Sequence, residues 1–231
     1  MRANALVVMA KAPVAGQVKT RLLPALSADE AAELCRALLI DQLEHLQGLA
    51  VADLYVAFTP DEAGSLMKQL VPAGCHLFPQ QGDDLGERMK RAFDHLRGLG
   101  HEQMVLIGSD LPPVPLRFFE DAYAYLQMSG QRAVLGPSRD GGYYLVGLNQ
   151  PVAGLFEAMT WSHGQVLAQT REKLAALEVD TLVLPSWFDI DTPDDLGYLQ
   201  SVLGRSLAAT MPNTLQLLRR LGLHHSAGRL D

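Results

Sequence analysis

Three positively charged side chains surround one loop that contains proline and glycine, near the start of the 231-residue chain. Lys11, Lys19 and Arg21 fall within eleven residues, and no acidic residue interrupts them. Lysine offers a point charge and arginine a planar fork of donors, so together they suit a polyphosphate. The spacing matches neither a P-loop nor Gly-x-Gly-x-x-Gly. The segment, with Pro13 and Gly16, is therefore a candidate phosphate-binding loop, the alternative being a solvated surface loop.

Two acidic positions could complete such a site by holding a divalent cation. Asp110 follows the apolar run 104–107, where an unpaired charge would be costly. Asp189 and Asp191 lie on the same side of an extended chain, because side chains alternate there. Mg²⁺ prefers one or two carboxylates together with substrate phosphates and water. We therefore expect Mg²⁺, or Mn²⁺ in its place, at these acids, although Asp110 could cap a turn and the later pair could serve a helix start.

A third segment combines glutamines with glycines, at Gln80, Gly82 and Gly86. Amide side chains can read the edge of a nucleobase, and glycines let the backbone approach it closely. These residues are candidates for nucleotide binding. The alternative is a turn followed by an acid-rich helix start.

A fourth segment places two glycines before two tyrosines. Its candidate contacts to a polar acceptor molecule are Asp140, Gly141, Gly142 and Tyr143. A tight hairpin is the alternative. Residues 161–164 could cover the same cleft, but a capped helix start is favoured for them.

Alternating strands and helices must position these residues. The predicted strands are short apolar runs, at 5–10, 51–58, 104–107, 133–136, 143–148 and 182–184, and the predicted helices lie at 27–46, 84–96 and 164–177. Thr59-Pro60 and Thr192-Pro193 are typical of helix starts, and Ser27 with Glu30 of a capping box. This alternation predicts a mostly parallel sheet covered by helices. We expect one domain over residues 1–200 and a helical tail over 201–231.

The composition excludes several classes of protein. The chain is 48% hydrophobic and carries a net charge of −7, so it is neither disordered nor held to nucleic acid by a general basic field. Cys35 and Cys75 lack the spacing of a metal site or a disulfide framework, and we expect both to be small buried hydrophobic residues. The N-terminal apolar run is too short for a secretory signal or a membrane span. We therefore expect a cytoplasmic protein with no membrane partner.

Four segments together resemble a known family, and residues 80–89 fit it as well. They are the loop 11–22, Gly108-Ser109-Asp110-Leu111-Pro112, the stretch 136–145 and Asp189-Ile190-Asp191-Thr192-Pro193 with the residues up to Leu196. Their order and spacing resemble an uncharacterised bacterial family of the GT-A, or nucleotide-diphospho-sugar transferase, superfamily. Its members are often labelled as glycosyltransferases associated with radical-SAM or arsenosugar genes. The basic first loop is also similar to that of phospholactate and molybdenum-cofactor guanylyltransferases, although Gly-x-Gly-x-x-Arg is missing.

The resemblance implies a Rossmann-like GT-A fold and a magnesium-dependent transferase. It implies that Lys11, Lys19 and Arg21 hold a triphosphate and that Asp110 binds metal with Asp189 or Asp191. It also implies that residues 80–86 read the base and that 140–142 meet a small-molecule acceptor. We expect either nucleotidyl transfer from a nucleoside triphosphate, which the basic loop favours, or glycosyl transfer from a nucleotide-sugar.

Two other classes of function stay open. Asp189-Ile190-Asp191-Thr192 also reads as the Asp-x-Asp-x-Thr motif of haloacid-dehalogenase phosphatases, but it occurs too late in the chain for that fold. A nucleotide-binding module without catalysis would not need two separated acids that complete a metal site.

Overall fold

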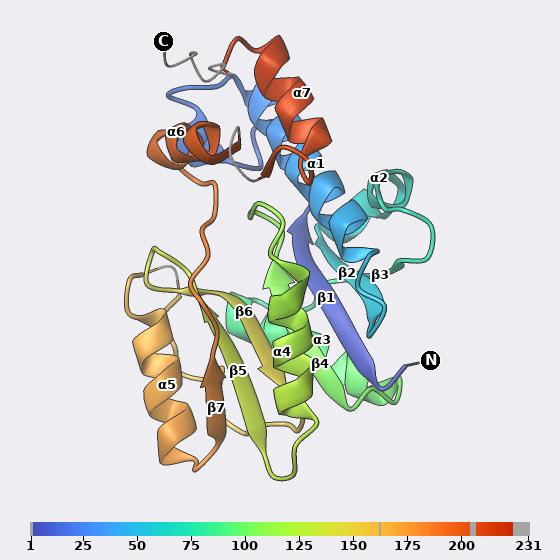
Figure 1. The fold of residues 1–231 in the computed structure, drawn as a ribbon, viewed down its shortest axis with the longest axis vertical. Coiled ribbons are helices and arrows are strands. Elements are labelled where there is room, and N and C mark those ends of the chain that lie inside the picture. The colour runs from blue at the N-terminus through green and yellow to red at the C-terminus, as the bar shows by residue number, and fades with distance from the viewer. Residues whose placement is uncertain (1, 162, 204–206, 224–231) are drawn as a thin grey trace.

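A single sheet of seven strands forms the centre of the computed structural model, which describes all residues except 1, 162, 204–206 and 224–231. In chain order the strands are β1 (Asn4–Lys11), β2 (Asp53–Thr59), β3 (His76–Pro79), β4 (Gln103–Gly108), β5 (Arg132–Pro137), β6 (Tyr143–Leu148) and β7 (Asp180–Val183). Their order in the sheet is β3-β2-β1-β4-β6-β5-β7. Strand β6 is antiparallel to both neighbours, and the other pairs are parallel. The predicted mostly parallel α/β sheet is confirmed (Figure 1).

Helices cover both faces of the sheet. They are α1 (Ala28–Leu46), α2 (Gly64–Leu70), α3 (Leu85–Gly98), α4 (Leu116–Leu126), α5 (Val166–Ala176), α6 (Pro193–Val202) and α7 (Pro212–Arg220), with short 3₁₀ helices η1 (Thr20–Leu22) and η2 (Asp61–Ala63). The helices α1, α2 and α4 pack on one face, and α3 and α5 pack on the other. Within the described ranges, none of these helices has the length and apolarity needed to cross a membrane.

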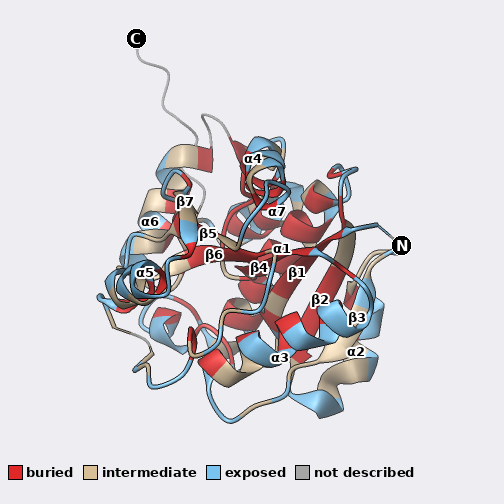
Figure 2. Cartoon of the chain, turned by 90° about the horizontal axis from the view of Figure 1, so that it is seen from below, coloured by how far each residue is buried: buried red, intermediate tan, exposed pale blue. Residues whose placement is uncertain are grey.

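Successive side chains of β1 pack alternately into the hydrophobic cores on the two faces of the sheet. Leu6, Val8 and Ala10 are buried with α1 and α4, whereas Ala5 and Val7 are buried with α3. Successive side chains of a strand point to opposite faces, so a strand covered on both faces is apolar throughout. The buried residues form a continuous band through the strands in Figure 2.

A third hydrophobic cluster lies above the carboxyl ends of the strands. It joins Leu22, the first half of α1, Ile190, α6 and α7. Figure 1 shows α7 alongside α1, with α6 nearby. The described part of the expected tail therefore shares a core with α1, while residues 224–231 lie outside the described structure.

Several predicted helix and strand boundaries can be compared directly with the structure. The predicted capping box is confirmed at Ser27 with Glu30, and the predicted helix start at Thr192-Pro193 is confirmed too, where Thr192 forms a second capping box with Asp195. The predicted helix cap at Thr59 is wrong, because Thr59 ends β2 and Pro60 precedes a 3₁₀ turn without a side-chain cap. Strand β3 was not predicted, since it has only four residues and ends in proline.

A buried carboxylate fixes α7 onto α1. Asp41 is 1% exposed and accepts hydrogen bonds from the backbone N–H groups of Asn213, at 2.9 Å, and Thr214, at 2.8 Å. These N–H groups belong to the first turn of α7, where no helical acceptor exists. Asp41 therefore caps α7 from a neighbouring helix.

The Asp41→Ala variant should have a free energy of unfolding lower by about 2 kcal/mol, because two buried N–H groups lose their charged acceptor. Urea unfolding measures the change. The control is Asp121→Ala, an exposed acid in the middle of α4, which should change stability by less than about 0.5 kcal/mol. Equal stability of the two variants would contradict the capping role.

Candidate functional site

The side chain of Lys19 lies at the centre of a polar cleft, and it is only 1% exposed. Its Nζ atom is 2.6 Å from Asp110 Oδ1 and 3.1 Å from Asp191 Oδ1. It also donates a hydrogen bond to the backbone carbonyl of Ile190 at 2.6 Å. All three N–H donors of the ammonium therefore have acceptors within reach.

The electrostatics of Lys19 follow from these contacts. Burial by itself lowers the pKa of Lys19, but the carboxylates of Asp110 and Asp191 outweigh burial and raise it above its ordinary value. The ammonium therefore stays charged. Its backbone is left-handed, with φ of 51°, a conformation that non-glycine residues adopt rarely. The loop thus turns at Lys19 so that the side chain enters the cleft.

Neighbouring strand ends bring the two carboxylates to Lys19. Asp110 follows β4, which is parallel to β1, so both strands end at the same edge of the sheet. The chain before α6 returns to this edge, where the Ile190 N–H donates to the Asp110 carbonyl at 2.9 Å. Trp187 holds the same segment through its indole N–H, which donates to the Pro112 carbonyl at 2.9 Å.

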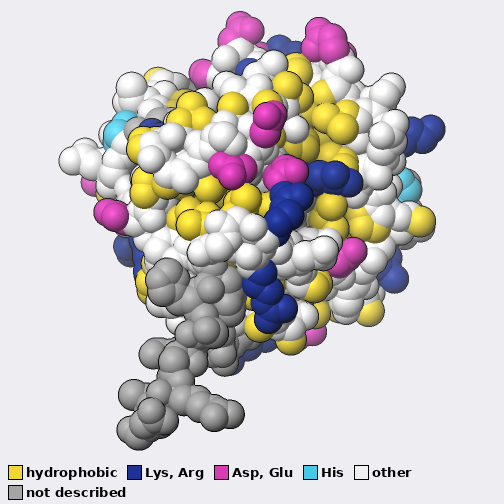
Figure 3. Space-filling view, turned by 90° about the horizontal axis from the view of Figure 1, so that it is seen from above, with side chains coloured by type: hydrophobic (Ala, Val, Ile, Leu, Met, Phe, Trp, Pro, Cys, Tyr) yellow, Lys and Arg dark blue, Asp and Glu magenta, His cyan; other side chains and the backbone are white. Residues whose placement is uncertain are grey.

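The cleft has a volume of about 450 Å³ and contains both signs of charge. Its described lining residues are Lys11, Val18, Lys19, Thr20, Arg21, Cys35, Asp110, Asp140, His163, Gly164 and Asp191. All three cations of the predicted phosphate loop are among them. Basic and acidic side chains also adjoin one another on the face seen from above (Figure 3).

The β5–β6 hairpin and the segment before α5 supply another part of the cleft wall. The hairpin closes with Ser138 N–H donating to the Gly142 carbonyl at 3.0 Å, so the predicted hairpin alternative is confirmed. Asp140 lies at its tip and accepts from the Gly142 N–H at 2.9 Å. The tip therefore presents a carboxylate to the cleft, with its orientation fixed by the hairpin.

The structure distinguishes the two acids of the late pair. Asp191 lines the cleft and contacts Lys19, whereas Asp189 is absent from the described lining residues. Burial, and then the neighbouring charges of Asp140 and Asp191, raise the pKa of Asp189 to about 6. The carboxylate that converges with Asp110 is therefore Asp191.

The residues predicted to read a base lie outside this cleft. The Gln80 amide donates to the carbonyls of Ala57, at 2.8 Å, and Ala10, at 3.2 Å, so it connects the ends of β1 and β2. Gly82 packs closely, since a Cβ there would meet the Arg88 backbone nitrogen at 2.9 Å. The Gln80 amide is therefore occupied by backbone carbonyls, and Gly82 is close to the backbone of α3, which are contacts with the protein itself.

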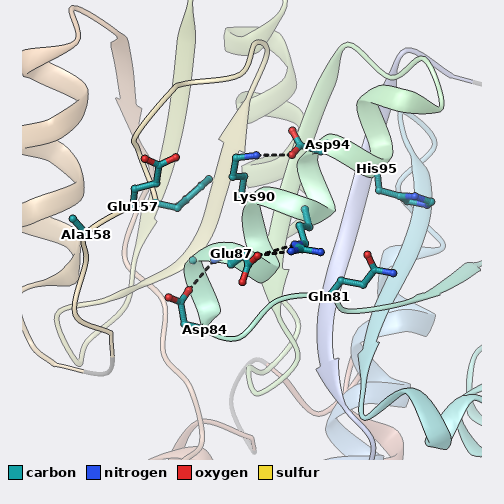
Figure 4. A pocket seen from close by; sticks show the side chains of 11 residues that line it. Gln81, Asp84, Glu87, Lys90, Asp94, His95, Glu157 and Ala158 are labelled. Atoms are coloured by element: carbon teal, nitrogen blue, oxygen red, sulfur yellow. Dashed lines mark hydrogen bonds and ion pairs between the residues drawn. The ribbon is translucent and has the colours of Figure 1, made fainter.

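Gly86 lines a second, larger hollow of about 850 Å³ beside α3 (Figure 4). A Cβ at Gly86 would come within 2.6 Å of the Phe156 carbonyl oxygen and of the Trp161 ring. Charged side chains of α3 in this hollow pair with one another, as Lys90 does with Asp94 at 2.8 Å. The described lining holds four acids and two bases, so the two bases are paired and the hollow keeps a net negative charge.

Other predicted contacts are also absent from the described lining of the Lys19 cleft. They are Pro13, Gly16, Gly141, Gly142 and Tyr143. Tyr143 packs with the core around α3, and burial raises its pKa well above the ordinary value. Its side chain thus serves the core.

The described lining includes three residues that the sequence did not assign to the site, Val18, Thr20 and Cys35, and two, His163 and Gly164, from the segment that could cover the cleft. Cys35 is buried, as expected, whereas Cys75 is only half-buried. Burial, and then the negative charge of Asp110, raise the pKa of Cys35 to about 12, so its thiol stays protonated. His163 lines the cleft and its Nδ1 accepts from the Gln165 N–H at 3.1 Å. The helix starts later than the favoured 161–164, because α5 begins at Val166 without a side-chain cap at Gln165, and Ser162 of the predicted start lies outside the described residues. In the sequence, the only indication of a role for His163 was its position in a loop just before a predicted helix.

Comparison with protein families assigns the chain to a group. Residues 42–163 match the family described as an uncharacterized protein conserved in bacteria (DUF2064). The chain belongs to this family. A search of the curated proteins gives no match. The resemblance to radical-SAM or arsenosugar-associated proteins and to guanylyltransferases stays a prediction.

Solved structures place this DUF2064 chain in the nucleotide-diphospho-sugar transferase fold. A protein from Desulfovibrio desulfuricans G20, provisionally described as a nucleotide-diphospho-sugar transferase, is 34% identical, with a TM-score of 0.80 over 98% of this chain and 100% of that one. A cytidylyltransferase from Leptospira borgpetersenii serovar Hardjo-bovis is 13% identical, with a TM-score of 0.60 over 96% of each chain. The 4-diphosphocytidyl-2C-methyl-D-erythritol synthase from Anaerococcus prevotii DSM 20548 is 11% identical, with a TM-score of 0.58 over 88% of this chain and 97% of that one. The last two likenesses concern the fold alone.

The close approach of Gly141 to Gly164 gives a test of how the cleft wall is built. A Cβ at Gly141, whose φ is 86°, would clash with the Gly164 carbonyl oxygen. Gly74 has a similar φ of 91° and open space around it. Gly141→Ala should therefore lower the free energy of unfolding by about 1–3 kcal/mol more than Gly74→Ala, as measured by urea unfolding. If the two variants are equally stable, the hairpin does not pack against the segment before α5 as described.

Proposed function

We propose that this protein is a magnesium-dependent transferase that uses an activated nucleotide, with nucleotidyl transfer from a nucleoside triphosphate as the favoured reaction. The observation that carries the proposal is the convergence of Lys19, Asp110 and Asp191 in one cleft that Lys11 and Arg21 also line. Ligands of open α/β sheets bind at this carboxyl edge of the strands. The fold shared with nucleotidyltransferases supports the same class of reaction.

The cations favour a substrate with several phosphates. Lys11, Lys19 and Arg21 come from one short stretch of chain and line one cleft of a protein whose net charge is −7. These three cations match the charge of a triphosphate better than that of a single phosphate, and Asp110, Asp140 and Asp191 in the same cleft balance them in the absence of a ligand. In the proposed reaction an acceptor oxygen bonds to the α-phosphorus, the bond from that phosphorus to the bridging oxygen breaks, and pyrophosphate leaves. Lys19 and Arg21 would stabilise the charge on the leaving group.

Asp110 and Asp191 fit the preference of Mg²⁺. Both carboxylates reach a common cation, the Lys19 ammonium. Among the described residues no three His, Cys, Asp or Glu side chains form a metal-binding group, so the substrate phosphates would supply further ligands. When bound there, Mg²⁺ would neutralise phosphate charge and orient the reacting groups. Asp140 and His163, which line the same cleft, would contact a small-molecule acceptor.

Glycosyl transfer from a nucleotide-sugar is the second candidate. It is favoured by the provisional description of the 34% identical Desulfovibrio protein as a nucleotide-diphospho-sugar transferase. In that reaction an acceptor hydroxyl would bond to the sugar carbon and a nucleoside diphosphate would leave. Lys11, Lys19 and Arg21 would then compensate the negative charge of a diphosphate.

A thermal-shift panel separates the two reactions. We expect a metal-dependent stabilisation by one nucleoside triphosphate that is larger than that by its nucleotide-sugars, since the triphosphate carries more charge. A ligand at about 100 times its Kd adds about 2.7 kcal/mol of stability. A larger shift with a nucleotide-sugar would favour glycosyl transfer. Absence of a shift with every nucleotide would contradict the proposal.

Asp110→Asn should keep the fold and reduce metal-dependent turnover by at least about a hundredfold, since one of two metal-binding carboxylates is lost. Product formation with the nucleotide chosen by the panel measures this loss. Asp121→Asn, on the exposed surface of α4, is the matched control and should keep full activity. Full activity of Asp110→Asn would remove the metal assignment.

A further inference from the structure

We propose that Lys19 keeps the divalent-metal site closed until substrate phosphates arrive, so that metal enters together with the nucleotide and not before it. The inference rests on the proposed function, because it concerns the two carboxylates assigned to the metal. It assigns to Lys19 the control of the order in which the ligands bind.

The first observation is that a cation already lies between the carboxylates. Lys19 Nζ is within 3.1 Å of one Oδ1 atom on each of Asp110 and Asp191. These are oxygens that a metal would use. A divalent ion that approached both would meet an ammonium at short range, where repulsion between like charges is strong. A metal that uses both Oδ1 atoms can therefore bind only after Lys19 has moved.

The second observation is that Lys19 does not leave without a substitute partner. Its side chain is 1% exposed, and its ammonium also donates to the Ile190 carbonyl at 2.6 Å. Withdrawing a buried charge from its partners is costly unless new acceptors replace them. Metal alone offers no acceptor for the N–H groups of Lys19, whereas phosphate oxygens do.

The third observation is that the cleft can bring phosphates to this lysine. Lys19 lines the same cleft as Lys11 and Arg21, and these two residues are exposed. Phosphates held there offer Lys19 new acceptors. The carboxylates of Asp110 and Asp191 then lose their monovalent partner, and their two negative charges match one divalent ion. The phosphates thus open the site that the metal completes.

The test measures Mn²⁺ binding without any nucleotide, from the electron paramagnetic resonance signal of free Mn²⁺ during titration. Lys19→Met keeps much of the side-chain length but removes the charge. We expect the wild type to bind Mn²⁺ weakly and Lys19→Met to bind it at least about tenfold more tightly. The double variant Lys19→Met/Asp110→Asn should lose this gain. Lys68→Met removes an exposed lysine of α2, changes the net charge equally and should leave binding at the wild-type level.

Three results would overturn the proposal. The wild type could bind Mn²⁺ as tightly as Lys19→Met, neither protein could bind it, or Lys68→Met could show the same gain. Lys19→Gln, which keeps a donor for the Ile190 carbonyl, repeats the comparison if Lys19→Met does not fold. Circular dichroism establishes folding before each titration.

The thermal-shift panel separates failure of this inference from failure of the proposed function. A wild type that responds to a triphosphate with metal, together with no gain in Lys19→Met, keeps the transferase proposal and rejects the role of Lys19. A gain in Lys19→Met, together with no response to any nucleotide, keeps the role of Lys19 and rejects the transferase proposal.

Discussion

The buried ammonium of Lys19 is the contact on which the arrangement of the site depends. It joins the loop after β1, the end of β4 and the segment before α6, three stretches far apart in the sequence. A buried charge of this kind needs its partners, so these stretches are constrained to meet. Leu22 and Ile190, close to the contact in sequence, belong to the hydrophobic cluster of α1, α6 and α7. The polar site and the upper core therefore support each other.

The topology of the sheet explains why the charges gather at one edge. Strands β1 and β4 are parallel neighbours, with Met9 opposite Gly108, so the residues that follow both strands emerge together. The return of the chain after β7 adds a third segment to that edge. Backbone hydrogen bonds position this segment, since the Ile190 N–H donates to the Asp110 carbonyl. Backbone pairing thus places the side chains of Asp110 and Asp191 close to Lys19.

Local signals in the sequence predicted the fold well. The apolar runs at β1 and β4, the capping box at Ser27 and the helix start at Thr192 depend on neighbouring residues alone, and the structure contains all of them. Strand β3 was missed because its four residues carry little pattern of their own and depend on pairing with β2. Long-range pairing leaves no such local trace.

The same distinction applies to the site. The basic loop and Asp110 were recognisable from residue types after a strand, and the cleft contains them. The choice of Asp191 over Asp189 depends on how a distant segment lies against β4, which alternation along the chain does not specify. Gln80 and Tyr143 were suggested as ligand contacts, but contacts with the ends of β1 and β2 and with the core around α3 occupy their side chains. Their neighbours in space were not visible in the sequence.

The antiparallel strand β6 has a consequence for how the cleft can vary among related chains. Because β6 reverses direction, the hairpin between β5 and β6 returns to the carboxyl edge without a helical crossover, and its tip carries Asp140 into the cleft. A residue inserted at that tip would alter one wall while leaving the pairing of β1 with β4 intact. Loops of this kind tolerate insertions more readily than strands. The length of the hairpin can therefore change the size of the cleft near Asp140 without changing the loop that carries Lys11, Lys19 and Arg21.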